Sequence, residues 1–544
     1  MKKLQANIVA LVMLLGIVLP GRLCANDVSV ALPDSSSLEV EYKAGLEAYK
    51  AADYKEAVRR WKKAAKKGHA GAQCNLGACY SKGLGVEVNQ KKAADWYGKS
   101  AMQGNSMAQS NLGNCYLSGN GVSQNFEEAV KWYILAAEQG NLQAITSLGV
   151  CYKLGEGTEL SPEKAFDCFK KAAFKGYPNA QNELGDCFYG GIGVRQDFSK
   201  ALYWYGEAAK RGVVAAQRSL AICYENGDGC VADRTKAVEW YRKAAEAGDA
   251  QSQYYLADIL LAEGKSTEAA EWLKKSARKG NADAQYLLAC CYFSGDGVQQ
   301  DYRMAYVWFR SASDKGDADA KCQLAGCYYS GRGVSADVEK AVELYFEAAE
   351  QGSADAQYFL AESYFNGAGV EHSMEEAYDW YCKAAEQEHP DAINNLAAFY
   401  YEGYVVEKND SIAVELFTMA AELGNAEAQN NLANCLMLGH GVEKDCLKAA
   451  RWFIRAAEQG NVNAQYKLGV LYYKGMGVQQ NYPEAVMWYR KAAANGHPSA
   501  QYDLGVCYYN GQGVERDRNE AVKWWKESAK QGDENARKAL RDMK

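Results

Sequence analysis

Residues 464–499, AQYKLGVLYYKGMGVQQNYPEAVMWYRKAAANGHPS, decide the fold because the chain repeats this stretch along most of its length. Residues 500–535 read AQYDLGVCYYNGQGVERDRNEAVKWWKESAKQGDEN, in the same register. Aligned in this way, residues 72–535 form thirteen rows, twelve of 36 residues and one of 32, residues 252–283. A regular repeat of this length predicts stacked supersecondary units rather than several separate globular domains.

Each row contains two apolar stripes with helical spacing. Counted from its first residue, a row has alanine at position 1, mostly leucine at position 5, often cysteine at position 8 and usually an aromatic residue at position 9. A second stripe occupies positions 22, 25, 26, 29 and 30. Both stripes follow the 3.6-residue period of an α-helix. Each row is therefore predicted to be a helix hairpin that buries its stripes against itself and the next hairpin.

Capping residues mark the boundaries of the second helix. In twelve of the thirteen rows, position 18 is a residue whose side chain can accept hydrogen bonds from first-turn N–H groups. These residues are Asn89, Asn125, Ser161, Asp197, Asp233, Asp301, Asp337, Ser373, Asn409, Asp445, Asn481 and Asp517. A glycine follows the second helix in most rows, as expected of a left-handed terminal residue. Examples are Gly104, Gly140, Gly460, Gly496 and Gly532. The predicted fold is all-α, a right-handed α-solenoid of stacked helix hairpins.

The shared pattern A-Q-x-x-L-G-x-C-Y-x-x-G-x-G-V-x-x-D-x-x-K-A-V-x-W-Y-x-K-A-A-x-x-G resembles the Sel-1-like repeat. This family is related to the tetratricopeptide repeat (TPR) and has a longer loop between its helices. The resemblance covers about nine tenths of the chain and implies a scaffold or adaptor that binds proteins. Residues 403–406 depart from the pattern by losing the second loop glycine, residues 155–158 lose the valine, and the row 252–283 loses the loop.

The N-terminus has the pattern of a secretory signal peptide. Lys2 and Lys3 precede an apolar run, residues 8–19, and small residues follow, with cleavage expected after Ala25. An uncleaved anchor and lipid attachment at Cys24 are weaker alternatives. The predicted organisation is a signal peptide at 1–25, a linker at 26–38, a divergent repeat at 39–71, thirteen repeats at 72–535 and a capping helix at 536–544. The protein is expected to be an exported, bacterial-type family member in the periplasm, in the cell envelope or secreted.

Composition and charge narrow the classes of partner. The chain is mildly acidic, with a net charge of -7, and no lysine or arginine cluster predicts nucleic-acid binding. No other apolar run is long enough to cross a membrane once the signal peptide is removed. The expected partner is a protein or a peptide.

The glycine pair between the helices, as in Gly295 and Gly297, has two interpretations. A nucleotide-binding loop would need a preceding strand, and here a helix precedes it. A tight turn with glycine at positive φ explains every copy and is the favoured interpretation.

The chain has 17 cysteines, and nine of them occupy position 8: Cys79, Cys115, Cys151, Cys187, Cys223, Cys291, Cys327, Cys435 and Cys507. Several of these rows contain no second cysteine, so packing between helices is favoured over a disulfide framework. Pairs that could still form disulfides are Cys74/Cys79, Cys223/Cys230, Cys322/Cys327 and Cys151/Cys168. No metal site is expected, because no C-x-x-C occurs and the histidines lie in different rows.

The resemblance also raises an enzymatic alternative, because some exported, cysteine-rich family members are described as penicillin-binding proteins or β-lactamases. Their Ser-x-x-Lys motif occurs twice, starting at Ser161 and Ser276. Ser161 is also a helix cap and Ser276 occupies a small-residue core position. Neither K-T-G nor S-D-N accompanies them. No enzymatic activity and no cofactor are therefore expected.

Aromatic residues outside the core positions give the candidate site. Positions 3 and 10 point away from position 5, on the far side of the first helix, which tetratricopeptide-like arrays use as a concave binding surface. From row 252 onward these positions are rich in aromatics: Tyr254, Tyr286, Phe293, Tyr329, Tyr358, Phe365, Tyr401, Tyr466, Tyr473, Tyr502 and Tyr509. They predict a groove for a peptide, with glycan binding as an alternative. The competing interpretation is that these rings pack laterally between neighbouring first helices.

Overall fold

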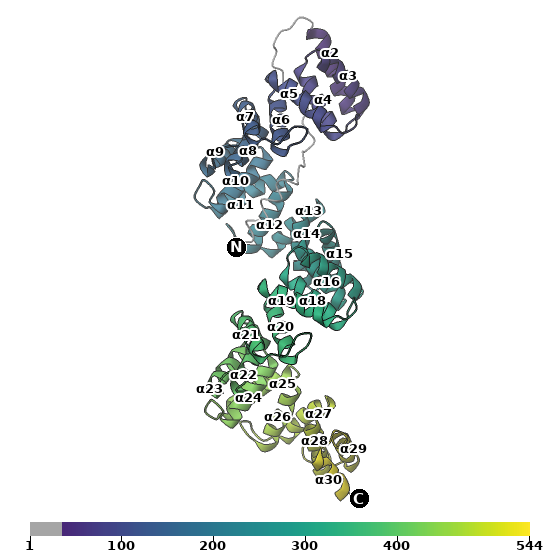
Figure 1. The fold of residues 1–544 in the computed structure, drawn as a ribbon, viewed down its shortest axis with the longest axis vertical. Coiled ribbons are helices and arrows are strands. Elements are labelled where there is room, and N and C mark those ends of the chain that lie inside the picture. The colour runs from purple at the N-terminus through teal and green to yellow at the C-terminus, as the bar shows by residue number, and fades with distance from the viewer. Residues whose placement is uncertain (1–34, 544) are drawn as a thin grey trace. The chain divides into compact units, whose positions relative to one another are not determined.

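The structure, a computed structural model, describes residues 35–543. The predicted signal peptide, Cys24 and most of the predicted linker lie outside this part of the chain. Between Ser35 and Asp542 it contains twenty-nine α-helices, and the described residues include no strand. The helices follow one another in antiparallel hairpins (Figure 1), which confirms the predicted all-α solenoid class.

The even-numbered helices from α2 to α28 are the first helices of the hairpins and the odd-numbered ones are the second helices. Their bounds are α2 Ser35–Lys50, α3 Tyr54–Lys66, α4 Ala70–Lys82, α5 Gln90–Met102, α6 Ser106–Ser118, α7 Phe126–Glu138, α8 Leu142–Leu154, α9 Pro162–Ala173, α10 Pro178–Gly190, α11 Phe198–Lys210, α12 Val214–Asn226, α13 Arg234–Glu246, α14 Ala250–Ala262, α15 Ser266–Arg278, α16 Ala282–Ser294, α17 Tyr302–Ser313, α18 Ala318–Ser330, α19 Val338–Glu350, α20 Ala354–Asn366, α21 Met374–Glu386, α22 Pro390–Glu402, α23 Asp410–Glu422, α24 Ala426–Leu438, α25 Cys446–Glu458, α26 Val462–Lys474, α27 Tyr482–Ala494, α28 Pro498–Asn510, α29 Arg518–Lys530 and α30 Glu534–Asp542.

The chain divides into two compact units. The N-terminal unit ends at Ile259 and the C-terminal unit begins at Leu260, so that the division falls within α14. Helix α2 starts at Ser35, four residues before the predicted start of the divergent repeat at residue 39, because residues 35–38 contain no proline or glycine that would stop the helix. Among the residues that the structure describes, no helix is both long and apolar enough to cross a membrane.

The predicted caps of the second helices are confirmed in all twelve rows. Each position-18 side chain accepts a hydrogen bond from a first-turn N–H group, as when Asn89 Oδ1 accepts from Lys92 N at 2.9 Å. The glycines that follow the second helices have positive φ, for example 84° at Gly104 and 96° at Gly532. Local sequence therefore sets where the second helices start and stop.

The glycine loop between the helices is a turn that also packs against the preceding repeat. Gly119 and Gly121 have φ of 70° and 81°. A Cβ atom on Gly121 would collide with the backbone carbonyl of Gln90, at the start of α5. Val405 takes the place of the second glycine in one loop and still has a φ of 54°. The loop keeps its left-handed conformation there at the expense of backbone strain.

The core consists of the alanine, leucine and cysteine positions of the first helices and one aromatic ring from each second helix. All nine position-8 cysteines are buried, which confirms that they pack between helices. Burial raises the pKa of Cys507 to about 12 and that of Cys115 to about 11. Cys230, from one of the candidate disulfide pairs, donates from Sγ to the carbonyl oxygen of Cys223 at 3.8 Å. These thiols are poor nucleophiles because the thiolate is disfavoured by burial.

A glutamine clasp joins successive hairpins. In the last full repeat, Gln501 Nε2 donates to the Ala493 carbonyl at the end of α27, and Gln501 Oε1 accepts from Gln531 Nε2 at 2.9 Å. The same thirty-residue pairing recurs at Gln73–Gln103, Gln109–Gln139, Gln357–Gln387 and Gln429–Gln459. Where the second glutamine is missing, the amide oxygen is buried without a partner among the described residues, as at Gln181, Gln217, Gln253, Gln285 and Gln465. The clasp thus depends on the residue after the second helix.

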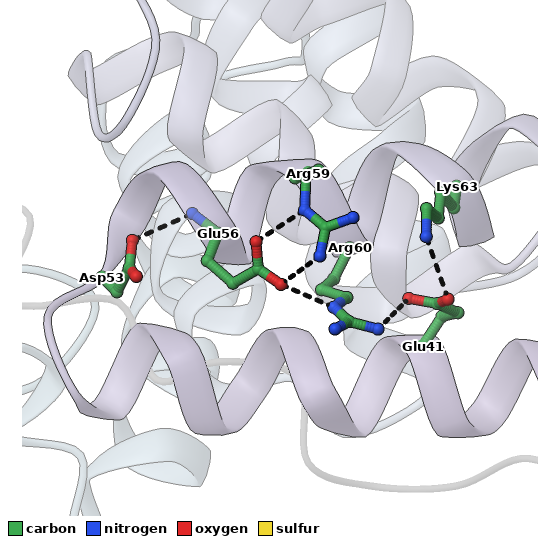
Figure 2. A network of polar contacts seen from close by, with 6 residues as sticks. All are labelled: Glu41, Asp53, Glu56, Arg59, Arg60 and Lys63. Carbon is green, nitrogen blue, oxygen red and sulfur yellow. Dashed lines mark hydrogen bonds and ion pairs between the residues drawn. The ribbon is translucent and has the colours of Figure 1, made fainter.

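The first hairpin, α2 and α3, has a short turn instead of the glycine loop, with Ala52 at a φ of 60°. Figure 2 shows the ion network that holds its helices together: Glu56 accepts from Arg59 and Arg60, and Glu41 accepts from Arg60 and Lys63. The hydrogen bonds from Arg59 and Arg60 lower the pKa of Glu56 to about 2. At the other end of the chain, α30 buries Ala536 against the last hairpin and exposes its charged residues, as a capping helix does.

Candidate functional site

Ten of the eleven predicted groove aromatics are half-buried, and Tyr329 is 47% exposed. Tyr254 lies on α14 in the N-terminal unit, 5.4 Å from Tyr255 between ring centroids. The other ten lie in the C-terminal unit on its first helices, from α16 to α28. The binding role of these residues stays a prediction, and their contacts show what else they do.

The position-3 tyrosines stack on neighbouring rings. Tyr358 lies 4.8 Å from His389 and Tyr466 lies 4.4 Å from His497, in both cases with nearly parallel rings. Burial raises the pKa of both tyrosines to about 12. The remaining two, Tyr286 and Tyr502, lie 6.0 and 6.5 Å from the core rings of α17 and α29. Tyr358 and Tyr466 therefore contact the residue that caps the following first helix. Tyr286 and Tyr502 contact the second helix of their own hairpin.

Two of the position-10 aromatics, Tyr401 and Tyr473, bond to the loop of the following repeat. Tyr473 donates from its hydroxyl to Gln512 Oε1 at 2.8 Å, across 39 residues. Tyr401 makes the equivalent bond with His440 Nδ1, also at 2.8 Å. Phe293, Phe365 and Tyr509 have no such bond and instead lie 6.4, 5.9 and 5.5 Å from the second-helix or core rings Phe309, Phe399 and Trp525. Some of the predicted groove rings therefore contact the following repeat, as the lateral-packing interpretation requires. Others contact the second helix of their own hairpin.

Two rings on adjacent first helices remain open to solvent. Tyr329 on α18 is 47% exposed, and Phe359 on α20 is 40% exposed. Phe359 stacks on the buried Tyr345 at 5.4 Å and lies 5.3 Å from Tyr358, so the ring is supported from within the core. Sequence reasoning missed Phe359 because it occupies position 4 of its row, whereas only positions 3 and 10 were expected to face the groove. An aromatic residue outside the core positions was the sequence signal that could have identified Phe359.

Carboxylates line the first turn of four consecutive first helices, at a spacing of 36 residues. These residues are Asp319, Asp355, Asp391 and Glu427 on α18, α20, α22 and α24. Each accepts a hydrogen bond from the residue that caps the next first helix: Ser353, His389, Asn425 and Asn461. The helix N-terminus favours a negative charge at this position. Sequence reasoning also missed this row, which links neighbouring repeats on their first-helix side.

His389 connects the carboxylates to the aromatic rings. Its Nδ1 accepts from Ala392 N at 3.2 Å and so caps α22, while Nε2 lies 3.4 Å from Asp355 Oδ1. Because Nδ1 accepts, the proton is on Nε2, which donates to Asp355. This bond lowers the pKa of Asp355 below its ordinary value. Asp355, His389, Tyr358 and Phe359 thus form a connected polar and aromatic surface on α20 and α22.

The equivalent face of the N-terminal unit contains ion pairs. Lys153 donates to Glu183 at 2.6 Å, and Arg218 donates to Asp249 at 2.6 Å. Asp186, which is half-buried, accepts from the Tyr205 hydroxyl at 2.7 Å. Burial raises the pKa of Asp186 to about 6. This part of the first-helix face is neutralised within the chain.

The two Ser-x-x-Lys motifs have structural roles. Ser161 Oγ accepts from Lys164 N and caps α9, and the Lys164 ammonium lies over the Tyr152 ring at 5.4 Å from its centroid. Ser276 is fully buried. The part of the chain that the structure describes contains no group of three or more histidine, cysteine and carboxylate side chains arranged to hold a metal ion.

Tandem helix hairpins, left-handed glycine turns and capped second helices define this chain as an α-solenoid repeat protein. The family model of the Sel1 repeat matches thirteen consecutive segments: residues 70–105, 106–141, 142–177, 178–213, 214–249, 250–281, 282–317, 318–353, 354–389, 390–425, 426–461, 462–497 and 498–533. The chain belongs to the Sel1 repeat family.

Two solved structures of repeat proteins are similar to this chain. A protective antigen present in uropathogenic Escherichia coli strains, with an SLR fold, is 33% identical over 90% of this chain and 97% of its own, with a TM-score of 0.51. A Sel1 repeat protein from Oxalobacter formigenes is 31% identical over 56% of this chain and 90% of its own, with a TM-score of 0.41. No curated protein matches the sequence significantly.

Proposed function

We propose that this protein is a scaffold that binds a protein or peptide partner through the first-helix face of its C-terminal unit. Helical repeats of this kind commonly mediate protein interactions. The observation that carries the proposal is the pair of exposed rings, Tyr329 and Phe359, on adjacent first helices. Large rings held rigidly from the core offer contact area at a small cost in conformational entropy.

Affinity capture tests this proposal. The full chain is immobilised, exposed to an extract of its native cell envelope, and the retained proteins are quantified by mass spectrometry. The variant Tyr329→Ser/Phe359→Ser is expected to lose the specific partner, because both rings leave the contact surface. A loss of about tenfold or more is expected, since interface aromatics often contribute about 1–2 kcal/mol each.

The N-terminal unit provides a matched control. Phe174 and Tyr203 are 70% and 60% exposed, so that Phe174→Ser/Tyr203→Ser removes two rings of similar size from another surface. This control should retain the partner. Capture that is unaffected by Tyr329→Ser/Phe359→Ser would show that binding uses another face. Binding to an arrayed glycan instead of any protein, with the same dependence on these rings, would favour the glycan alternative.

We propose no hydrolytic role for the Ser-x-x-Lys motifs. Ser276 is inaccessible to a substrate, and the Ser161 hydroxyl is used as a helix cap. A reactive β-lactam probe followed by peptide mass mapping should label neither serine. A covalent adduct on Ser161 would contradict this proposal.

We also propose that the protein is exported, because its first residues follow the pattern of a signal peptide. The mature protein from its native envelope should then begin at Asn26. N-terminal sequencing is the direct measurement, and a mature chain that still begins at Met1 would argue for retention as an anchor or for a cytoplasmic protein.

A further inference from the structure

Charge is distributed very unevenly along the chain. Residues 317–427 contain 22 acidic and 5 basic side chains, a net charge of -17, whereas the whole chain carries only -7. This acidic segment, as we call residues 317–427, includes α18 to α23 and the start of α24, all in the C-terminal unit. The rest of the chain is therefore net positive, and the acidity of the protein is concentrated in three repeats.

The five cations of the acidic segment are engaged away from the first-turn carboxylates. Lys321 pairs with Glu347, Lys340 with Glu343 and Lys408 with Asp410. Lys383 lies over the Trp380 ring, and Arg332 lies over the Phe293 ring. As a result, Asp319, Asp355, Asp391 and Glu427 have no lysine or arginine partner within residues 35–543. Their hydrogen-bond partners are cap residues.

Exposed aromatic rings coincide with this acidic segment. The four large aromatic side chains that are most exposed in the described C-terminal unit all fall within it: Tyr329, Phe346, Phe359 and Tyr404, at 40 to 47% exposure. Two of them, Tyr329 and Phe359, are the rings of the proposed binding face. Aromatic faces attract cations, and the attraction adds to that of nearby carboxylates.

Helix α20 brings the two kinds of group together. Asp355, Phe359 and Glu362 are spaced at i, i+4 and i+7 and therefore form one stripe along the helix. Asp355 is 56% exposed, and Phe359 is backed by Tyr345 so that its outer side meets solvent. Glu362 Oε1 already accepts from the Tyr381 hydroxyl and from Asn395 Nδ2, so Asp355 is the exposed carboxylate available to a cation placed on the Phe359 ring.

A buried amide lies behind this face on α24. Asn430 lies three residues after Glu427, on the same side of the helix, and is 4% exposed. Its Oδ1 has no hydrogen-bond partner among the described residues, while Nδ2 donates to Asn431 Oδ1. Asn430 Oδ1 has no surface open to solvent, so the acceptors that the face offers to a partner are the first-turn carboxylates.

From these observations we infer that the partner of the first-helix face is a lysine- and arginine-rich protein segment, docked along α18 to α24. The inference rests on the proposed function and specifies the chemistry of its partner. Ammonium and guanidinium groups bind the row Asp319, Asp355, Asp391 and Glu427, and one of them stacks on Phe359. Such a surface also accelerates association with a cationic partner at low ionic strength.

A random peptide library displayed on phage tests this chemistry even while the natural partner is unidentified. Selection on the full chain is expected to enrich lysine and arginine over the unselected library. A labelled synthetic copy of an enriched peptide then allows affinity to be measured by fluorescence anisotropy at increasing salt. The affinity should fall steeply with salt, because the contacts are between exposed charges.

Two triple variants with the same change in charge locate the surface. Asp355→Asn/Asp391→Asn/Glu427→Gln neutralises three of the four carboxylates of the first-turn row but keeps oxygen acceptors for the helix caps. We expect it to weaken the peptide roughly tenfold, as three exposed charge contacts of about 0.5 kcal/mol each would. Glu350→Gln/Asp379→Asn/Glu415→Gln neutralises exposed carboxylates of the second helices α19, α21 and α23 and should weaken it less than about threefold. Equal weakening by both variants would overturn the inference, because it would indicate non-specific attraction.

The variant Phe359→Leu keeps an apolar side chain and removes the ring. It should weaken the lysine-containing peptide about threefold or more, as expected when a cation–π contact is lost. Enriched peptides without basic residues that still depend on Tyr329 and Phe359 would overturn the inference while leaving the proposed function intact. Circular dichroism of each variant confirms that the helices remain folded.

Discussion

The first-helix faces of the two units use charge in opposite ways. Around α8 to α12 the N-terminal unit pairs its carboxylates internally, through Lys153 with Glu183 and Arg218 with Asp249. Around α18 to α24 the C-terminal unit bonds its carboxylates to helix caps, with no lysine or arginine within reach among the described residues. The same helical scaffold can therefore support either an internally neutralised face or a face that attracts a charged partner.

The largest expected effect comes from breaking the internal neutralisation. Lys153→Met leaves Glu183 and the half-buried Asp186 without their cation and should lower the free energy of unfolding of the N-terminal unit by about 3–5 kcal/mol. In the C-terminal unit, Lys321→Met removes a cation whose partner Glu347 is 54% exposed, and it should cost about 1 kcal/mol or less. Urea unfolding followed by circular dichroism measures both. Similar losses in the two variants would refute the proposed difference between the units.

Asp503 is the carboxylate of the C-terminal unit that most resembles Asp186. Burial raises its pKa to about 6, against an ordinary value of 3.8. Between these values the folded state binds the proton more tightly than the unfolded state, so stability falls as the pH rises from about 4 to about 6. Asp503→Asn should remove this fall and make the protein about 2 kcal/mol more stable above pH 6. Thermal unfolding across this range is the measurement, and an unchanged pH profile would contradict it.

The glutamine clasp allows a third comparison, between repeats that have it and repeats that lack it. Gln387→Ala leaves Gln357 Oε1 buried without its donor and should cost about 1–2 kcal/mol. Conversely, Asn495→Gln supplies the missing donor for Gln465 Oε1 and should stabilise the protein by about 0.5–1 kcal/mol. The measurement is the denaturant concentration at the midpoint of unfolding, compared between each variant and the unmodified chain. If Asn495→Gln lowered the stability, the longer side chain would not donate a hydrogen bond to Gln465 Oε1.

The smallest expected effect concerns the loop between α22 and α23. Val405 adopts a φ of 54°, where the matching loop position is glycine in most repeats. Val405→Gly should relieve the strain and stabilise the protein by about 1 kcal/mol, less the entropic cost of glycine in the unfolded chain. The control is Val231→Gly, at an exposed loop residue with negative φ, and this change should not stabilise the protein. A rise in the midpoint of thermal unfolding for Val405→Gly alone is the expected result.

The sequence predicted the hairpins well because their determinants are local. Asn89 and Asp517 cap the helices that they were expected to cap, and Gly104 and Gly532 adopt the left-handed conformation. The buried position-8 cysteines followed from the 3.6-residue period. The candidate site was harder to predict, because Tyr473 and Tyr401 are occupied by bonds to loops 39 residues away, which depend on the packing of adjacent repeats. Phe359 became a candidate only through its exposure and its support by Tyr345.

By itself, the sequence determined the all-α repeat architecture, the helix ends and the core, since propensity, capping and periodicity act within one repeat. It also contained the acidic segment, whose charge can be counted without a structure. Only the tertiary structure decided which charges of the chain are compensated by an opposite charge. An ion pair such as Lys153–Glu183 forms between side chains 30 residues apart in the sequence. Whether an aromatic ring faces solvent or a neighbouring repeat was decided in the same way, since exposure depends on what the next hairpin covers.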